Sequence, residues 1–305
     1  MRKFILDTDI GADCDDVAAI YYLLGKMEDG ECEVSAITLC TARQCAPAAV
    51  KAFTSDNGYL KIPIGAYKGK PLCCDEWDNY AEVIANGRRE ECDDAVALMR
   101  KVLSENEKTD IICIGPMCNI ANLLTSGADD YSSKSGAELI KERAGKLYLM
   151  GGAFEFAQNE KPFAEWNIEQ DAESAKTVFE NFPNEIVVCP SEAGAKVATV
   201  AGVTNSLLRE SMEVFFLTID KKGGAEYAEN PERTRPSWDP LTCMVALCES
   251  DYNYSEKGTV KVAENGVTDF AAERNGKHKY LSADNDFAAI EKRLNEYLKN
   301  LCQKR

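Results

Sequence analysis

The stretch between residues 7 and 16 constrains this chain most. Five carboxylates fall within these ten residues, directly after a short apolar segment, residues 4–6, that is typical of a buried strand. A helix-like apolar pattern begins at Val17, and Gly11 gives the backbone freedom for a tight turn between strand and helix. We therefore expect the acids at the carboxyl end of a first strand, where open α/β sheets bind ligands.

Carboxylates at this density repel one another, and hard divalent cations prefer the oxygen ligands that carboxylates offer. The alternative interpretation is an Asp-rich helix N-cap, because Asp suits the first turn of a helix. One or two acids fit such a cap, whereas five exceed what it needs. The stretch therefore favours a site for a metal or a phosphate-type ligand over a cap alone.

Composition narrows the classes of partner. The chain has 305 residues, of which 45% are hydrophobic, and a net charge of −16. That charge argues against a nucleic acid or an anionic membrane as partner and admits a neutral or cationic small molecule. No apolar run approaches the roughly 20 residues of a membrane span, and the first residues lack a signal-peptide core. We therefore expect a cytoplasmic protein.

The thirteen cysteines are an odd number and form no C-x-x-C pair, so reduced thiols are expected. Most lie in apolar contexts, such as Cys113, Cys189, Cys243 and Cys248, and are expected to be buried spectators. With His278 as the only histidine, a zinc finger or a Cys–His nucleophile is disfavoured. His278 lies outside every motif, and we expect it at the surface.

Strand-like and helix-like segments alternate along the chain. Strands are expected at residues 4–6, 33–39, 62–66, 110–116, 146–152 and 185–190, and helices at 46–56, 94–104, 119–124, 171–181 and 285–301. Residues 73–89 look irregular, 205–247 look helical with a break at 221–236, and 258–279 look like a small antiparallel piece. This alternation predicts an α/β fold: a doubly wound, mostly parallel sheet flanked by helices, in a single domain over residues 1–305.

Three later stretches fall at expected strand ends or helix starts. Ile114 ends a buried strand before Gly-Pro, so its carbonyl is expected to point at the site. Residues 159–167 offer amides and a carboxylate, which suit the binding of hydroxyl groups. Trp238 and Asp239 place an aromatic and an acid directly before Pro at a helix start. Together with the first loop, these stretches indicate an oxygen-ligand metal site beside a polyol pocket.

In these residues the chain resembles the inosine-uridine-type nucleoside hydrolases. The motifs that carry the resemblance are Asp7-x-Asp9-x-Gly11 with Asp15-Asp16, Ile114-Gly-Pro-x-x-Asn119, Met150-Gly-Gly-Ala153, Glu165-x-Asn167 and Trp238-Asp239. They occur in the family's order and cover essentially the whole chain. The resemblance implies a doubly wound α/β core, usually in homodimers or homotetramers, that acts on a small-molecule nucleoside.

The resemblance also implies roles for single residues. One Ca²⁺ would be held at the pocket floor by Asp9, Asp16, Asp239 and the carbonyl of Ile114, and Asp9 would also take the proton from a water. The ribose hydroxyls would be bound by Asp15, Asn159, Glu165 and Asn167. The chemistry agrees, because cleavage of an N-glycosidic bond builds an oxocarbenium-like cation that an acidic pocket stabilises.

The chain departs from the family's pattern at three places. Two extra residues precede the final acid pair, which makes Asp13 a rival for one acid's role. Many members carry Val-x-Gly-Asn where this chain ends a strand with Cys-Thr-Ala-Arg43, so that amide is missing and Arg43 is expected near the pocket. Uridine-cleaving members have His before the last Asp, where this chain has Trp238.

Trp238 matches the purine-specific branch, which stacks the base between aromatic rings. Trp77 or Tyr80 would supply the opposing ring, and stacking on indole favours a protonated purine by roughly 1–2 kcal/mol when desolvated. The alternative is that both tryptophans are ordinary core residues.

The main hypothesis is therefore a Ca²⁺-dependent ribonucleoside hydrolase that favours purines. One alternative is the hydrolase of another N-riboside, such as nicotinamide riboside. A second is a non-catalytic ribose- or nucleoside-binding protein, which the missing amide supports and the full set of metal acids opposes.

Overall fold

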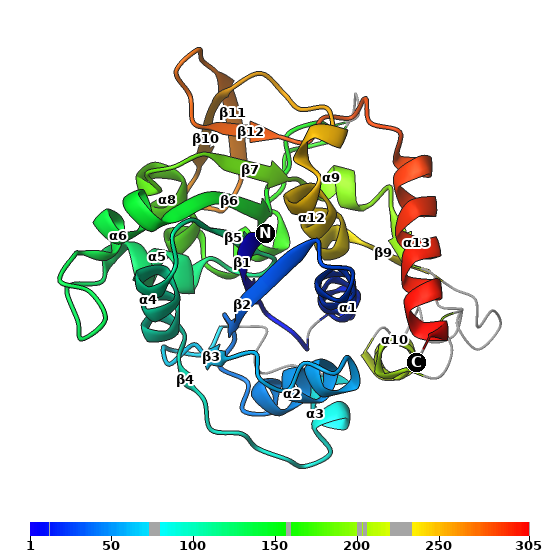
Figure 1. Cartoon of the computed structure of the whole chain (residues 1–305). Coiled ribbons are helices and arrows are strands. Elements are labelled where there is room, and N and C mark those ends of the chain that lie inside the picture. Colours follow the sequence, from blue (N-terminus) through cyan, green and yellow to red (C-terminus); the bar gives the residue numbers. More distant parts are fainter. Residues whose placement is uncertain are drawn as a thin grey trace.

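The computed structural model describes residues 1–11, 13–72, 80–156, 160–199, 203, 206–219 and 234–304. A ten-stranded sheet runs through the molecule in the order β11-β10-β12-β7-β6-β5-β1-β2-β3-β4 (Figure 1). Its strands are β1 (Arg2–Thr8), β2 (Cys32–Leu39), β3 (Ile64–Ala66), β4 (Asp93–Asp94), β5 (Thr109–Cys113), β6 (Ala144–Met150), β7 (Ile186–Cys189), β10 (Gly258–Val262), β11 (Thr268–Ala272) and β12 (His278–Tyr280). A separate antiparallel pair joins β8 (Ala198–Thr199) to β9 (Arg235–Pro236).

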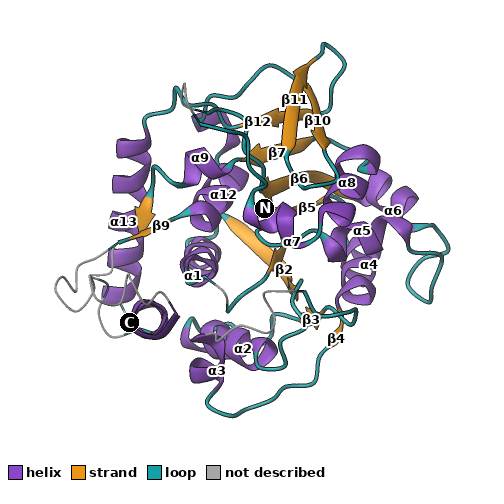
Figure 2. Cartoon of the chain, turned by 180° about the vertical axis from the view of Figure 1, so that it is seen from behind, coloured by secondary structure: helices purple, strands orange, loops and turns teal. Residues whose placement is uncertain are grey.

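Helices flank both faces of the large sheet (Figure 2). The α-helices are α1 (Asp15–Glu28), α2 (Ala46–Asp56), α3 (Tyr80–Ala85), α4 (Ala95–Glu105), α5 (Cys118–Thr125), α6 (Gly136–Arg143), α7 (Trp166–Gln170), α8 (Ala172–Asn181), α9 (Ser191–Gly194), α10 (Leu207–Val214), α12 (Trp238–Leu247) and α13 (Phe287–Gln303). A π-helical turn, η2 (Phe215–Ile219), follows α10, and a 3₁₀ turn, η3 (Glu249–Asp251), follows α12.

The first strand shows how one apolar segment serves two cores. Phe4 and Leu6 face the cluster that α1, α2, α12 and α13 cover, whereas Ile5 faces the cluster under α4, α5, α6 and α8. Successive side chains of a strand point to opposite faces, so a strand covered on both sides is apolar throughout. The prediction of a doubly wound, mostly parallel sheet flanked by helices is confirmed.

The central position of β1 sets the place of the site. It pairs in parallel with β2 on one side and with β5 on the other, so the order of the strands reverses there. In open α/β sheets such a reversal leaves a crevice at the carboxyl ends of the strands. The acid-rich loop that follows Thr8 therefore lies at the crevice.

The C-terminal segment differs from the expected small antiparallel piece. β10 and β11 are antiparallel, but β12 pairs in parallel with β7, so the segment extends the main sheet. Such an antiparallel edge is common on large, otherwise parallel sheets. Four helices were also not expected: α3 within the segment predicted to be irregular, α6, which a capping box of Ser135 and Glu138 begins, and the short α7 and α9.

The expectation that His278 is a surface residue is wrong. Only 5% of His278 is exposed, its Nδ1 accepts the N–H of Val260 at 2.9 Å, and its ring meets that of Phe179 edge to face. Burial lowers the pKa of His278 to about 4, so the imidazole is neutral at physiological pH.

The cysteines largely follow the expectation. All those within the described residues are free thiols, and Cys113, Cys189 and Cys243 are buried, although Cys248 is only half-buried. Among the described residues, no helix has both the length and the apolar character needed to cross a membrane.

Candidate active site

The acid loop joins β1 to α1 as the sequence predicts. Gly11 adopts a φ of 127°, a conformation that side chains rarely tolerate and that the tight turn requires. Asp15 and Asp16 occupy the first turn of α1, where the helix dipole favours negative charge. Thr8, at the end of β1, donates its hydroxyl hydrogen bond to Asp16. Strand and helix together therefore fix this carboxylate.

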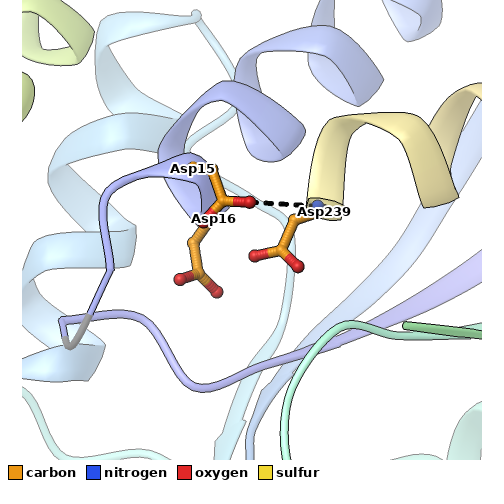
Figure 3. Close-up of side chains that lie close together, drawn as sticks. All are labelled: Asp15, Asp16 and Asp239. Carbon is orange, nitrogen blue, oxygen red and sulfur yellow. Dashed lines mark hydrogen bonds between the residues drawn. The ribbon is translucent and has the colours of Figure 1, made fainter. Parts of the chain in front are cut away.

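A second helix brings another acid to the same point. Asp239 lies in the first turn of α12, and its backbone N–H donates to Oδ2 of Asp15 at 3.1 Å. The amino termini of α1 and α12 thus meet, as Figure 3 shows. One carboxylate oxygen from each of Asp15, Asp16 and Asp239 lies within 4.8 Å of the other two.

These three carboxylates form an electrostatically unfavourable group. Burial, and then repulsion from neighbouring carboxylates that include Asp9 and Asp13, raises the pKa of Asp15, Asp16 and Asp239 well above the usual range of aspartate. Within the described part of the chain, no lysine or arginine forms an ion pair with any of them. Their all-oxygen donor set fits a hard divalent cation, which would remove the repulsion. The three carboxylates therefore fit such a cation by their oxygen atoms and their charge.

Asp9 lines the same cavity but stands outside this group of three. It is 6% exposed, and it packs so closely on Gly115 that an added Cβ there would lie 2.8 Å from Oδ1 of Asp9. Arg43 was expected near the pocket, and its Nη1 donates to the backbone carbonyl of Asp9 at 3.2 Å. Arg43 therefore supports the loop from behind rather than facing the cavity.

The first acid of the stretch, Asp7, has a structural place. Its fully buried carboxylate accepts hydrogen bonds from the hydroxyl of Thr38 at 2.6 Å and from Nδ2 of Asn119 at 2.8 Å. Burial raises the pKa of Asp7 to about 7. Since Asn119 also donates to the carbonyl of Leu39, this motif residue ties β1, β2 and α5 together below the site.

The acid and amide of the Glu165-x-Asn167 motif line the same cavity. Oε1 of Glu165 accepts the N–H of Asn167 at 3.1 Å and Oε2 accepts that of Gly152 at 3.3 Å. Burial raises the pKa of Glu165 to about 7. Nδ2 of Asn167 lies 3.4 Å from the carbonyl oxygens of both Ile114 and Met150. The Ile114 carbonyl is thus in contact with the amide of Asn167, and both residues line the cavity.

A cavity of about 590 Å³ connects these groups. It brings together most of the predicted site residues: Asp9, Asp15, Asp16, Ile114, Glu165, Asn167, Trp238 and Asp239. The other two, Asn159 and Trp77, lie outside the described residues. Tyr80, the alternative to Trp77, is completely buried and does not line the cavity.

Arg235 is a cavity-lining residue that the sequence reasoning missed. Its Nε lies 2.9 Å from Oδ1 of Asp13, and its Nη2 also bonds that carboxylate. Its guanidinium carbon lies 4.9 Å from the ring centre of Phe215 and 5.3 Å from that of Trp238. Arg235 fell in a stretch expected only to interrupt a helix, and the extra acid Asp13 was the one sequence signal for it.

Comparisons with known proteins agree with this geometry. The family model described as inosine-uridine preferring nucleoside hydrolase matches residues 4–285. Among solved structures, a plant nucleoside hydrolase has a TM-score of 0.73 at 20% identity and covers 98% of this chain and 99% of its own. A purine-preferring ribonucleoside hydrolase from Gardnerella vaginalis has 0.72 at 20%, and an inosine-uridine preferring nucleoside hydrolase from Bacillus anthracis has 0.67 at 19%, both covering 100% of each chain.

A search of curated proteins finds no match. The solved structures share the fold, and the family model spans the acid loop, the amide motif and the Trp238-Asp239 pair in one alignment. The chain therefore belongs to the inosine-uridine preferring nucleoside hydrolase family, whose members are enzymes that hydrolyse the N-glycosidic bond of ribonucleosides.

Proposed function

We propose that this protein hydrolyses ribonucleosides to free base and ribose, that it depends on Ca²⁺, and that it favours purines. The observation that carries the proposal is the buried group of Asp15, Asp16 and Asp239 at the floor of a cavity of about 590 Å³. Buried carboxylates this close together are costly unless a cation offsets their charge. A role in catalysis would explain why the fold keeps such an unfavourable group of buried charges.

Asp9, Asp16, Asp239 and the carbonyl of Ile114 are the residues that we propose as ligands of the cation. All four line the cavity, and all supply the oxygen atoms that Ca²⁺ accepts in larger number and looser geometry than Mg²⁺ does. When bound, such a cation offsets the repulsion of the carboxylates and lowers the pKa of a water molecule that it holds. The ligand set leaves room for sugar hydroxyls to complete it.

Asp9 is the residue that we propose as general base. It accepts a proton from the attacking water while the oxygen of that water bonds to C1′ of the ribose. The C1′–N bond breaks, and its electron pair leaves with the base. Because the ribosyl group becomes positively charged on the way, the surrounding carboxylates lower the energy of the transition state. Tight packing against Gly115 holds Asp9 in one position for this step.

Asp15, Glu165 and Asn167 are proposed to bind the ribose hydroxyls, with Asn159 as a fourth partner outside the described residues. Asp15 and Glu165 accept hydrogen bonds, whereas the amide of Asn167 both donates and accepts. Backbone N–H groups already orient Asp15 and Glu165. This preorganisation supports a role in positioning the sugar, because fixed groups lose little entropy when they bind.

The proposed purine preference rests on the aromatic wall of the cavity. Trp238 is held by a hydrogen bond from its Nε1 to the carbonyl of Ser191 at 2.9 Å, and Phe215 lines the cavity beside it. A bicyclic base covers more of such a wall than a pyrimidine does. Trp77, which we expected as a further aromatic partner, lies outside the described residues.

The release of free base from a panel of inosine, guanosine, adenosine, uridine and nicotinamide riboside tests the proposal. We expect turnover of the ribonucleosides, with kcat/KM for inosine above that for uridine by at least about tenfold, which is roughly 1.4 kcal/mol. Cleavage of nicotinamide riboside alone would transfer the function to another N-riboside. Binding without any cleavage would make the protein a nucleoside-binding member of the fold.

A homodimer or homotetramer is also part of the proposal, supported only by the resemblance to the family. Light scattering coupled to size-exclusion chromatography would measure the oligomeric state. A monomer at micromolar concentration would contradict this part of the proposal. The cytoplasmic location stays a prediction.

A further inference from the structure

The cavity has two chemically different sides. One side carries the carboxylates and the amide of Asn167, which suit a sugar and a cation. The other side carries the rings of Phe215 and Trp238 with the guanidinium of Arg235 against both. A nucleoside is likewise a polyol joined to a flat, aromatic base. If the ribose occupies the first side, then its base lies on the second.

An ion pair with Asp13, an acid of the first side, fixes Arg235 on the aromatic side of the cavity. Nε and Nη2 of Arg235 bond both oxygens of Asp13, a residue of the acid loop. The two side chains keep 23% and 28% of their surface exposed, so the ion pair borders the cavity instead of being sealed under it. The forked contact sets the plane of the guanidinium and engages only two of its three nitrogen atoms.

We infer, on the basis of the proposed function, that Arg235 determines specificity for the leaving base by contacting it. It selects bases that carry a ring carbonyl, as hypoxanthine, guanine and uracil do, over adenine. A guanidinium has only N–H donors, which match a carbonyl oxygen and do not match the 6-amino group of adenine.

The same contact stabilises the departing group. When the C1′–N bond breaks, its electron pair passes to the base and spreads onto the carbonyl oxygen, close to the fixed positive charge. The water oxygen bonds to C1′ and its proton goes to Asp9, while the base takes its own proton from solvent afterwards. Arg235 keeps all its protons throughout, because guanidinium does not titrate in proteins.

The position of Arg235 explains how a base can leave a pocket so rich in carboxylates. Asp239 and Asp15 would repel a base that gains negative charge, and the chain has no histidine in the cavity to protonate it. Asp13 is paired with Arg235, so this extra acid adds no net charge beside the base. The extra acid of the loop, Asp13, thus acts together with Arg235.

The test compares Arg235→Met with Arg293→Met on three substrates. Arg293 is a matched control, because it pairs with Asp251 at 3.1 Å and lies over the ring of Tyr252, away from the cavity. The substrates are inosine, adenosine and p-nitrophenyl β-ribofuranoside, whose nitrophenolate leaves without help. We expect Arg235→Met to lower kcat/KM for inosine on the order of 10–100-fold and to change the other two by less than about threefold. Arg293→Met should change none of them.

Arg235→Lys provides a second variant if the methionine variant folds poorly, as judged by circular dichroism. It keeps the charge but loses the fork, so we expect an intermediate loss on inosine and none on the nitrophenyl riboside. Equal losses on all three substrates, or no loss on inosine, would overturn the inference while leaving the hydrolase function standing. If the native protein cleaves none of the three, then the proposed function itself fails.

Discussion

Two groups of charged residues lie at the two ends of α12, which runs between opposite ends of the strands. At its amino end, Asp239 joins Asp15 and Asp16, and burial with repulsion from nearby carboxylates raises the pKa of all three. Directly beyond its carboxyl end, Glu249 accepts hydrogen bonds from Lys146 at 2.7 Å and Lys279 at 2.6 Å.

The second group supplies its own cations. Burial alone would raise the pKa of Glu249, but the bonds from Lys146, Lys279 and the hydroxyl of Tyr148 outweigh it and lower the pKa to about 2. Glu185 pairs with Lys146 at 2.8 Å and Lys257 at 2.7 Å. Lysine side chains therefore neutralise the carboxylates of Glu249 and Glu185, whereas no lysine or arginine of the described residues pairs with Asp15, Asp16 or Asp239. Acids with pKa values perturbed in this way cluster at functional sites.

The largest expected effect separates the two groups by activity. Asp9→Asn removes the proposed base and should lower kcat on the order of 10²–10⁴-fold, with a smaller change in KM. Glu249→Gln, a matched loss of one carboxylate charge at the other end, should leave kcat within about twofold. Steady-state kinetics with inosine measure both. Near-native turnover of Asp9→Asn would move the role of base to Asp15.

The second prediction tests how closely Asp9 must be held. Gly115→Ala places a Cβ 2.8 Å from Oδ1 of Asp9 and 2.6 Å from Sγ of Cys40, so one of them must move. A displacement of this kind should cost roughly 10–100-fold in kcat. Gly127→Ala is the control, because an added Cβ there meets nothing within 4 Å. Equal activity of the two variants would show that the position of Asp9 is not critical.

The third prediction concerns the aromatic wall. Trp238→Ala should slow inosine and leave uridine nearly unchanged, so that the expected preference of at least about tenfold largely disappears. Both rates are read from released base. If native protein cleaves uridine and inosine equally well, then Arg235 would be the dominant partner of the base and stacking a minor one.

Glu249→Gln is expected to have the smallest effect on activity but the largest effect on how stability depends on pH. Glu249 has a folded pKa of about 2 against 4.5 in the unfolded chain, so its contribution is fully present above about pH 4.5 and is lost as the pH falls toward 2. That shift corresponds to at most about 3 kcal/mol, and solvent screening reduces it because Glu249 is only half-buried. Thermal melts between pH 6 and pH 3 should therefore fall less steeply for Glu249→Gln than for native protein. Parallel curves would mean that the lysines do not hold Glu249 as described.

The sequence predicts the acid site better than it predicts the edges of the fold. The strand, turn and helix around Asp15 and Asp16 are local, and Gly11 marks the turn, so their placement follows from neighbouring residues. The parallel pairing of β12 with β7 joins segments about ninety residues apart, and His278 looks like a surface residue until that pairing buries it.

Arg235 escapes prediction for the same reason. Its partner Asp13 is more than two hundred residues away, and only the fold brings them into contact. The motif residue Asn119 shows the converse limit, because its spacing marks the family while its side chain serves Asp7 beneath the site. Spacing along the chain therefore identifies the group of residues but does not assign each member's contacts.

Removal and return of the metal test the central claim most directly. The protein is dialysed against a strong chelator, its metal content is measured, and inosine hydrolysis is followed while Ca²⁺ or Mg²⁺ is titrated back. We expect no turnover without metal, recovery near one equivalent of Ca²⁺, weaker recovery with Mg²⁺, and a higher melting temperature on Ca²⁺ binding, since a ligand that binds only the folded state stabilises it. Full turnover by protein shown to hold no metal would contradict the claim that the acids of α1 and α12 act through a bound cation.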